Sequence, residues 1–386
     1  MKILHFYKTF FPDTFGGVEK VIDQISIMTA ALGVQSEVLC LTPKKDESST
    51  EINGYQVHRS PRLFKIASTA FSTKVFRRFS QLAENADIIH YHFPWPFADI
   101  VHFSLIVNKP SIVTYHSDIV KQKILLKLYK PLMNRFLSDM DCIVATSPNY
   151  AASSTVLRNF SEKVSIIPIG IVKELYPNPK KERLEYWRNK FKNKFFLFIG
   201  VLRYYKGLQY LIEAARRVNA PIVIIGSNDS MDQELKTQAL KLGVENIHFL
   251  GTISEEDKVA LLMLCYGVVL PSHLRSEAFG IALLEGAMFG KPLISCEIGT
   301  GTSYINIDKQ TGLVVPPHDS FALGAALQFL LERPEEAYAM GVQAEKRYWT
   351  HFTADKMANS YLECYEGLLA DRKATGLISR PTRRGL

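Results

Sequence analysis

Residues 195–226 read FFLFIGVLRYYKGLQYLIEAARRVNAPIVIIG and contain one complete strand–helix–strand unit. The apolar run Phe195–Ile199, closed by a glycine, predicts a buried strand, and Leu208–Val218 has the apolar spacing of a helix. A second apolar run, Pro221–Gly226, predicts the next strand. Because strands that alternate with helices form βαβ units, the stretch predicts an α/β fold with a parallel sheet.

The same alternation extends along the whole chain. Before this unit, strands are expected at Ile3–Phe6, Val38–Leu41, Ile88–His90, Ser111–Tyr115 and Cys142–Thr146, and a helix at Gly17–Leu32 that Gly33 closes. After it, strands are expected at His248–Gly251, Gly267–Pro271, Pro292–Cys296 and Gly312–Val315. These patterns predict two doubly wound, Rossmann-like domains, residues 1–175 and 195–350, separated by a segment rich in prolines and charges.

Helical patterns dominate the C-terminal part of the chain. Helices are expected from Phe321 onward, with a break at Trp349-Thr350. A final helix, from about Thr353 to Arg372, is expected to cross back to the first domain, so that residues 353–386 belong with it.

The composition is that of a globular protein, since 47% of the 386 residues are hydrophobic and 22% are charged. The longest apolar run near the middle, Val259–Leu270, is too short to cross a bilayer, and the N-terminus lacks the apolar core of a signal peptide. Five scattered cysteines without a Cys-x-x-Cys pair argue against disulfides and a zinc cage, and they favour a reducing cytoplasm.

The net charge of +8 is unevenly distributed. Six Lys/Arg and no acid lie between Glu51 and Glu84, and five Lys/Arg and no acid lie between Asp118 and Asp139. Within the second stretch, residues 121–130 place lysines on one helical side and apolar residues on another. Such a helix predicts contact with an anionic membrane surface; the alternative is a solvated helix face over a core.

Candidate site residues are those that directly follow strands, because ligands of parallel sheets bind outside the carboxyl ends of the strands. Two such sheets imply a cleft between the domains. Gly16 and Gly17 follow the first strand and open a helix, which lets the backbone approach a phosphate. They do not form the Gly-x-Gly-x-x-Gly fingerprint, so no nicotinamide cofactor is expected. His116 and Asp118 follow the strand that ends at Tyr115; an ordinary loop histidine is the alternative.

The second domain offers two cations and two carboxylates. Arg203 and Lys206 follow its first strand and predict a phosphate clamp, with plain surface charge as the alternative. Glu285 lies on a segment that is apolar on every other side, and Glu277 precedes that helix, where backbone N–H groups are unpaired. A buried carboxylate needs a partner, and no cation lies within one turn of Glu285, so a pair of ligand hydroxyls is one candidate. The alternative is that Glu285 meets water and Glu277 is an ordinary first-turn glutamate.

Asp139-Met140-Asp141 has the form of a metal-binding Asp-x-Asp motif. It directly precedes a strand, however, at the end opposite to the ligand face of the sheet. We therefore expect a solvated turn there and no metal site. Two cations and a helix N-terminus provide the positive charge that a metal ion would otherwise supply.

Five motifs occur in the order and at the spacing of one enzyme family. They are Gly16-Gly17-Val18-Glu19, His116-Ser117-Asp118, Ile167-Pro168-Ile169-Gly170-Ile171, Gly200…Lys206-Gly207 and Glu277-Ala278-Phe279-Gly280…Glu285. From Met1 to about Glu366, the chain resembles the retaining glycosyltransferases of family 4, whose GT-B fold has two facing Rossmann-like domains with an interdomain cleft. One departure is Gly200-Val201-Leu202 where the family commonly has Gly-Arg-Leu, with Arg203 two places later.

Further stretches resemble the bacterial mannosyltransferases and rhamnosyltransferases that build lipopolysaccharide O-antigen from GDP-linked sugars. These are His5-Phe6-Tyr7-Lys8-Thr9 with Pro12-Asp13-Thr14, Val113 to Asp118, and Gly299-Thr300-Gly301-Thr302-Ser303 with Asn306. The resemblance implies that the first domain binds the acceptor and the second binds the nucleotide sugar.

The resemblance also implies a role for each candidate residue. Glu285 would bind the ribose hydroxyls, and Glu277 would bind hydroxyls of the transferred sugar. The backbone N–H groups that help Glu277 would be those of Phe279, Gly280 and Ile281. Arg203 and Lys206 would neutralise the leaving diphosphate, with the Gly16-Gly17 loop closing from the other domain. His116 would lie near the anomeric carbon on the acceptor side, and Asp118 would also face the acceptor.

The expected function is that of a retaining, metal-independent hexosyltransferase without a cofactor. It would move mannose from GDP-mannose to a polyprenyl-diphosphate-linked saccharide at the inner face of the cytoplasmic membrane. Alternatives within the family use GDP-D-rhamnose or a UDP-sugar. Outside it stand a non-hydrolysing sugar-nucleotide epimerase, a pyridoxal-dependent phosphorylase and a basic nucleic-acid-binding protein. The last leaves Glu277 and Glu285 without a purpose, so no nucleic-acid partner is expected.

Overall fold

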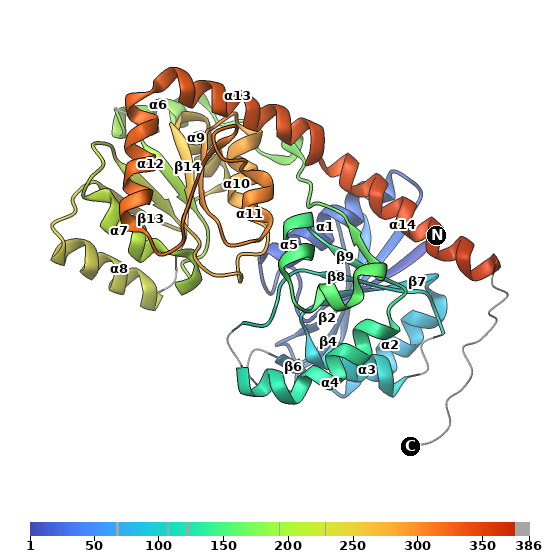
Figure 1. The fold of residues 1–386 in the computed structure, drawn as a ribbon. Coiled ribbons are helices and arrows are strands. Elements are labelled where there is room, and N and C mark those ends of the chain that lie inside the picture. The colour runs from blue at the N-terminus through green and yellow to red at the C-terminus, as the bar shows by residue number, and fades with distance from the viewer. Residues whose placement is uncertain (67–68, 106–107, 121–122, 193, 228, 375–386) are drawn as a thin grey trace. The chain divides into compact units, whose positions relative to one another are not determined.

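The structure is a computed structural model that describes residues 1–386 except 67–68, 106–107, 121–122, 193, 228 and 375–386. The described chain divides into two compact units (Figure 1). The first holds residues 1–146, 154–170 and those from 354 onward, and the second holds 147–153 and 171–353. Each contains one mainly parallel sheet with helices on both faces, so the predicted α/β class with two doubly wound sheets is confirmed.

The sheet of the first unit has eight strands in the order β10-β9-β8-β7-β1-β2-β4-β3. Its strands are β1 Lys2–Phe6, β2 Gln35–Thr42, β3 Ser48–Ile52, β4 Tyr55–Pro61, β7 Ile88–Phe93, β8 Ser111–Tyr115, β9 Cys142–Ala145 and β10 Val164–Ile166. A separate two-stranded sheet pairs β5 Phe64–Ile66 with β6 Thr69–Phe71 in antiparallel orientation. The helices are α1 Gly17–Ala30, α2 Lys74–Asn85, α3 Pro96–Ser104, α4 Lys123–Asp139 and α14 Ala354–Ala374, with a 3-10 turn at Leu157–Lys163.

The sheet of the second unit has six parallel strands in the order β13-β12-β11-β14-β15-β16. Its strands are β11 Phe196–Ile199, β12 Ile222–Ile225, β13 Ile247–Gly251, β14 Gly267–Leu270, β15 Leu293–Cys296 and β16 Gly312–Val315. The helices are α5 Pro148–Ser153, α6 Lys181–Lys190, α7 Leu208–Ala215, α8 Asp229–Lys241, α9 Glu255–Leu264, α10 Ile281–Met288, α11 Gly301–Ile305, α12 Ser320–Glu332 and α13 Pro334–His351. Short 3-10 turns lie at Lys173–Leu175 and Tyr204–Lys206.

The central strands are short apolar runs that are buried along their whole length. All residues of β7, β8 and β11 are buried, because helices cover both faces of the sheet around them. The strands expected from apolar runs are therefore found within about two residues of their predicted ends, except that β2 and β7 extend further. Gly33 closes the first helix in the left-handed conformation (φ 81°), as the sequence predicts.

The break between the last two helices lies later than the sequence predicts. It was expected at Trp349-Thr350, but α13 continues to His351 and α14 begins at Ala354. Thr350 donates its hydroxyl to the carbonyl of Lys346, which accommodates a β-branched residue within the helix. Phe352 is fully buried and donates its N–H to Tyr348, so the chain leaves the helix only after this side chain is packed.

The antiparallel edge formed by β3 and β4 was not expected from the sequence. Asn53 and Gly54 connect these strands with positive φ angles of 49° and 85°, which is the backbone of a two-residue hairpin turn. The Asn-Gly pair is the signal that predicts such a turn. The strands were missed because β3 carries mostly exposed polar residues and has no apolar run.

Helix α14 belongs to the first unit, although it follows the second in the sequence. It packs against α1, and its tyrosines reach strands of the sheet. Tyr361 shares a hydrogen bond of 2.9 Å with Thr114, and Tyr365 shares one of 2.8 Å with His90. Among the described residues, no helix combines the length and apolar character needed to cross a bilayer.

Candidate functional site

Lys206 and Glu277 form a part-buried ion pair at the carboxyl end of the second sheet. Lys206 follows β11, Glu277 follows β14, and the Lys206 ammonium donates a hydrogen bond to the Glu277 carboxylate. Ser272 donates its hydroxyl to the same carboxylate at 3.2 Å. Burial lowers the pKa of Lys206, but attraction to Glu277 outweighs burial and leaves the pKa above its ordinary value. Lys206 is therefore a cation held at the edge of the sheet.

Gly207 allows this loop to pass close to the neighbouring strand end. It has a φ of 72°, and a Cβ atom at this position would lie 2.0 Å from the carbonyl oxygen of Pro271. No other residue fits both the left-handed backbone and the space. Glycine at position 207 therefore allows the tight turn that brings Lys206 to Glu277.

The Arg203 side chain is exposed and makes no hydrogen bond or ion pair with any described residue, whereas the Lys206 side chain pairs with Glu277. The two cations expected to act together therefore have different surroundings. Lys206 is a fixed charge, and Arg203 has a side chain that remains available to a ligand.

The N-terminus of α10 offers unpaired backbone donors beside Glu277. Gly280 precedes the helix with a φ of 97°. In the described chain, the backbone N–H groups of Phe279, Gly280 and Ile281 donate to no other protein group. Such groups attract negative charge or hydroxyl oxygens.

Glu285 has protein partners that the sequence did not reveal. Its side chain is buried, and one carboxylate oxygen accepts hydrogen bonds from Tyr176 at 2.9 Å and from Lys258 at 3.0 Å. Burial lowers the pKa of Lys258, but Glu285 and Glu255 outweigh it and raise the pKa above its ordinary value. The expectation that Glu285 needs a ligand to satisfy it is wrong in that form, because Lys258 reaches it from α9 rather than from its own helix.

In the first unit, the Gly16-Gly17 loop is folded over the side chain of Glu19. The Glu19 carboxylate accepts hydrogen bonds from Thr9 at 2.9 Å and from Thr14 at 2.6 Å. A Cβ atom at Gly16 would lie 2.3 Å from one Glu19 oxygen, so a larger residue would displace the carboxylate. Glycine therefore lets the loop approach the Glu19 side chain without displacing it.

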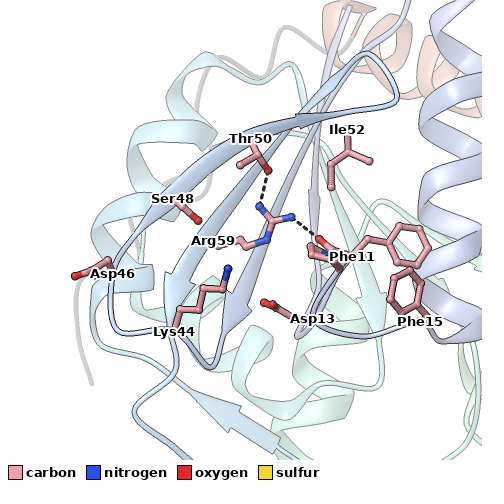
Figure 2. A pocket seen from close by; sticks show the side chains of 10 residues that line it. Phe11, Asp13, Phe15, Lys44, Asp46, Ser48, Thr50, Ile52 and Arg59 are labelled. Carbon is pink, nitrogen blue, oxygen red and sulfur yellow. Dashed lines mark hydrogen bonds between the residues drawn. The ribbon is translucent and has the colours of Figure 1, made fainter.

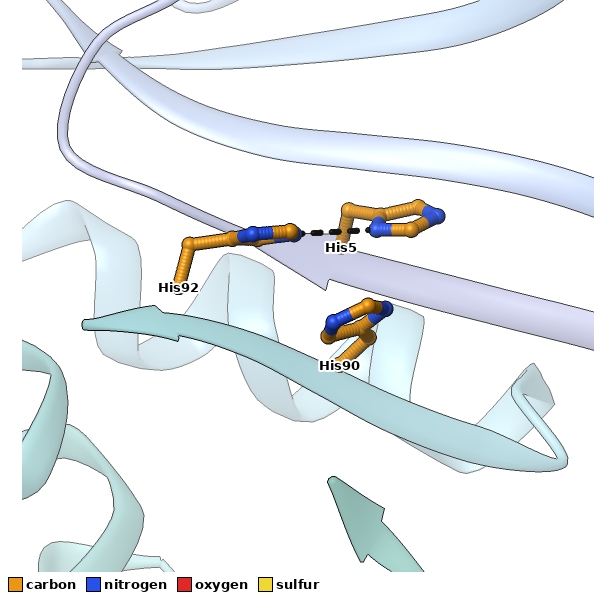
Figure 3. Close-up of side chains that lie close together, drawn as sticks. All are labelled: His5, His90 and His92. Carbon is orange, nitrogen blue, oxygen red and sulfur yellow. Dashed lines mark hydrogen bonds between the residues drawn. The ribbon is translucent and has the colours of Figure 1, made fainter. Parts of the chain in front are cut away.

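His116 is the end of a line of three buried histidines. Its Nε2 shares a hydrogen bond of 3.0 Å with Nδ1 of His92, whose Nε2 shares one of 3.1 Å with Nδ1 of His5. Figure 3 shows the rings of His5 and His92 joined in this way, with His90 beside them. Burial lowers the pKa of His5 to about 3, and burial together with Lys8 lowers the pKa of His116 to about 3. Both rings are therefore neutral near pH 7.

The same region contains a possible set of metal ligands. Ring nitrogens of His5, His90 and His92 lie within 4.8 Å of one another. Both nitrogens of His90 are engaged, with Tyr365 at 2.8 Å and Thr114 at 2.7 Å, and both nitrogens of His92 bind other histidines. A metal ion would have to break these bonds, so the geometry favours a hydrogen-bonded histidine cluster.

The remaining aspartates are engaged within the first unit. Asp118 accepts hydrogen bonds from the hydroxyls of Tyr115 and Ser154, each at 2.8 Å. Asp139 pairs with His102 at 2.8 Å, and Asp141 accepts the backbone N–H of Ser111 at 2.7 Å. The two carboxylates of the Asp-x-Asp motif thus bind separate groups.

Sequence reasoning missed the partners of the candidate residues. These are Lys258, Tyr176 and Ser272 in the second unit and His5 and His92 in the first. The alternation His90-Tyr91-His92 was the available signal, because residues two apart on a strand share one face of the sheet.

Two family descriptions match most of the chain between them. The description "Glycosyltransferase Family 4" matches residues 15–175, and "Glycosyl transferases group 1" matches residues 180–347. Solved structures with the same fold include a sucrose-phosphate synthase from Thermosynechococcus elongatus, with a TM-score of 0.79 at 20% identity over 96% of this chain and 99% of that one. HepE from Anabaena, in complex with UDP, gives a TM-score of 0.76 at 19% identity over 95% of this chain and 100% of that one.

Two curated relatives are similar over nearly their full length. D-rhamnosyltransferase WbpZ from Pseudomonas aeruginosa is 53% identical over 354 residues, which are 92% of this chain and 93% of the relative. O-antigen chain mannosyltransferase C from Escherichia coli is 47% identical over 372 residues, which are 96% of this chain and 100% of the relative. The chain therefore belongs to glycosyltransferase family 4, and it is a glycosyltransferase with the GT-B fold.

Proposed function

We propose that this glycosyltransferase moves mannose from GDP-mannose, with retention of configuration, to a polyprenyl-diphosphate-linked saccharide in O-antigen synthesis. The observation that carries the proposal is the near full-length similarity to an O-antigen chain mannosyltransferase. A second candidate sugar is D-rhamnose, which the higher identity to a D-rhamnosyltransferase favours. The two sugars differ by one hydroxyl group, so a single contact can decide between them.

The nucleotide sugar is proposed to bind at the carboxyl end of the second sheet. Glu285 holds the ribose hydroxyls with its second carboxylate oxygen, for which no protein hydrogen bond is found among the described residues. Glu277 and the N-terminus of α10 hold the transferred sugar. This assignment is supported by three adjacent N–H groups without protein partners and by a carboxylate already fixed by Lys206.

Charge develops on the diphosphate as the glycosidic bond breaks. Lys206 is already held at the site by Glu277 and needs no reorientation to stabilise this charge, and the exposed side chain of Arg203 is available to close over the diphosphate. The leaving phosphate is proposed to accept the proton of the acceptor hydroxyl on the same face of the sugar. Transfer is expected to continue in EDTA, and loss of activity that manganese alone restores would contradict this.

The acceptor lipid is proposed to reach the enzyme at an anionic membrane surface. Ile124, Leu125 and Leu128 of α4 are exposed, so the apolar side of this helix does not cover a core at these positions. Leu125 and Leu128 line a groove of about 340 Å³ together with Ile66, Phe71 and Pro96. Three exposed lysines lie close in sequence to these apolar residues: Lys65 adjoins Ile66, and Lys127 and Lys130 flank Leu128. Their positive charge would attract anionic lipid headgroups.

A panel of donors tests the sugar assignment. GDP-mannose is expected to raise the melting temperature more than UDP-glucose or UDP-galactose, because a ligand that binds only the folded protein stabilises it. Transfer from each donor to a labelled lipid-linked saccharide is then measured. Hydrolysis or epimerisation of the donor without transfer to any acceptor would overturn the proposal.

Liposome sedimentation tests the membrane assignment. Binding to anionic vesicles is expected at low salt and release at high salt, because salt screens surface attraction. Leu128→Ser should weaken binding, whereas Leu240→Ser, at an exposed leucine of the second unit, should leave it unchanged. Equal binding to neutral and anionic vesicles would contradict the proposal.

A further inference from the structure

A cavity of about 650 Å³ opens in the first unit, beside the loop between β1 and α1 (Figure 2). The β3–β4 hairpin forms another wall of the same cavity. Its lining combines an aromatic pair with charged and hydroxyl side chains: Phe11, Phe15, Asp13, Arg59, Lys44 and Thr50 among them. None of these residues has a role in the donor site described above.

Arg59 is a buried cation without a carboxylate partner. Arg59 is 4% exposed, and it takes part in no ion pair with any described residue. One terminal nitrogen donates to the Thr50 hydroxyl at 2.6 Å and the other donates to the carbonyl of Phe11, but Nε has no partner. Burying a charge without a counter-ion is costly, and an unused donor adds to that cost. Such a cost is expected where a ligand supplies the missing acceptor.

Asp13 supplies the opposite charge in the same cavity. Its Oδ2 atom is buried and has no hydrogen-bond partner among the described residues. A simple anion would be attracted by Arg59 but repelled by Asp13. A cation would be attracted by Asp13 but repelled by Arg59. A neutral ligand with several hydroxyl groups can use both, because a hydroxyl donates to a carboxylate and accepts from a guanidinium.

Two aromatic rings complete the lining. Phe11 and Phe15 stack with ring centroids 5.1 Å apart, and Phe15 is 70% exposed. An exposed phenylalanine gains by contact with the apolar C–H face of a ligand. Figure 2 shows the two rings next to each other at one side of the view, with Asp13 and Arg59 nearer its centre. Apolar faces edged by hydroxyl groups are the chemistry of a sugar ring.

We propose that this cavity binds a saccharide, and that in the full reaction it holds part of the sugar chain of the acceptor. The last step rests on the proposed function. Asp13 and Phe15 belong to the loop that runs directly into Gly16 and Gly17, so the cavity and the expected phosphate-binding loop are parts of one segment. A volume of about 650 Å³ is in the range of ligand pockets and accommodates more than one sugar ring.

The first test measures saccharide binding without any donor. A soluble α-linked mannotriose is titrated into the full chain and its contacts are followed by saturation-transfer NMR. Phe15→Ala and Asp13→Asn are each expected to weaken binding about tenfold. Phe321→Ala removes an equally exposed phenylalanine from the second unit and is the matched control, with unchanged binding expected. Unchanged binding in both cavity variants would overturn the proposal, as would displacement of the saccharide by inorganic diphosphate.

The second test measures transfer kinetics. Phe15→Ala and Asp13→Asn should raise KM for the acceptor about tenfold while leaving KM for the donor and the affinity for free GDP unchanged. Arg59→Gln should weaken saccharide binding. It should not lower the melting temperature, because it removes a buried charge that has no counter-ion. Saccharide binding without any glycosyl transfer would refute the proposed function and leave the cavity assignment intact. Equal changes in donor and acceptor KM would overturn the cavity assignment.

Discussion

Glu277 and Glu285 are both buried and each is paired with a lysine, but the groups around them differ. Glu277 lies beside the unpaired N–H groups of α10, whereas Glu285 joins α10 to Lys258 of α9 and to Tyr176. The side chains therefore have structural roles even before a ligand binds. Substitution tests must separate that structural role from binding.

Glu285→Gln is expected to weaken the binding of GDP by about 1.5–3 kcal/mol. It should also lower the melting temperature, because Lys258 loses a buried partner. Glu277→Gln is expected to leave GDP affinity nearly unchanged and to lower both kcat and kcat/KM for GDP-mannose. Calorimetric titration with GDP, alongside initial rates, measures both effects.

The control for Glu285 is the double variant with Lys258→Met. It removes the lysine that has lost Glu285 and keeps only Glu255 as an ionic partner, so stability should recover relative to Glu285→Gln while GDP affinity should not. Recovery of both would mean that Glu285 acts only through the fold. Loss of GDP binding in Glu277→Gln alone would reverse the two assignments.

His92 is expected to position His116 by sharing a hydrogen bond with its Nε2. His92→Phe keeps a buried ring but removes both nitrogens, so kcat should fall about two- to tenfold. His92→Asn, which keeps a polar atom near the Nδ1 position, should recover part of the rate. His90→Phe is the matched control, since His90 lies on the same strand but bonds to Thr114 and Tyr365. An equal loss of rate in both phenylalanine variants would contradict a specific positioning role.

At the scale of elements, α10 lies close to the sheet at whose carboxyl end we propose that the donor binds. A Cβ atom at Gly286 would lie 2.8 Å from Val268 and 2.9 Å from Leu293, so this helix approaches β14 and β15 through a glycine. Strand ends and helix N-terminus are thereby held at a short, fixed separation. The position of Glu277 and of the α10 N–H groups depends on that separation.

Gly286→Ala is expected to destabilise the protein by about 1–3 kcal/mol, because the added methyl overpacks the interface. Gly367→Ala, in α14, meets nothing within 4 Å and should instead stabilise by about 0.5–1 kcal/mol through helix propensity. Urea unfolding of both variants gives the comparison. A destabilised Gly367→Ala, or a Gly286→Ala without effect, would contradict this account of the packing.

At the scale of the whole molecule, the histidine cluster makes stability depend on pH. Burial lowers the pKa of His5 and His116 to about 3, and burial with neighbouring histidines holds the pKa of His90 and His92 well below 6.5. Below pH 6.5 the unfolded chain binds protons that the folded cluster does not. The contribution of these residues to stability is therefore complete above pH 6.5 and is lost as the pH falls toward the folded values.

At pH 5.5, His5 and His116 should each reduce the free energy of unfolding by about 1 kcal/mol relative to pH 7.5, and His90 and His92 should change it in the same direction. Urea unfolding between pH 7.5 and 5 measures the slope. His90→Phe removes one titrating ring from the cluster and should reduce the slope by about one proton. An unchanged slope in this variant would show that other groups control acid stability.

The sequence by itself determined the features that depend on local pattern. Short apolar runs predicted every strand of the two sheets except β3, β4 and β10, because a buried parallel strand must be apolar on both faces. The same reasoning identified the residues that follow strands, including Lys206, Glu277 and His116. It missed the β3–β4 edge, whose exposed polar residues carry no such pattern.

Only the tertiary structure decided which side chains meet. The partners of Glu285 lie 27 and 109 residues away, and the line from His5 through His92 to His116 is assembled from neighbouring strands and a loop. The saccharide cavity likewise joins the β1–α1 loop to a hairpin that the sequence did not reveal. Strand order and register determine these contacts, and the local spacing of apolar and polar residues determines neither of them.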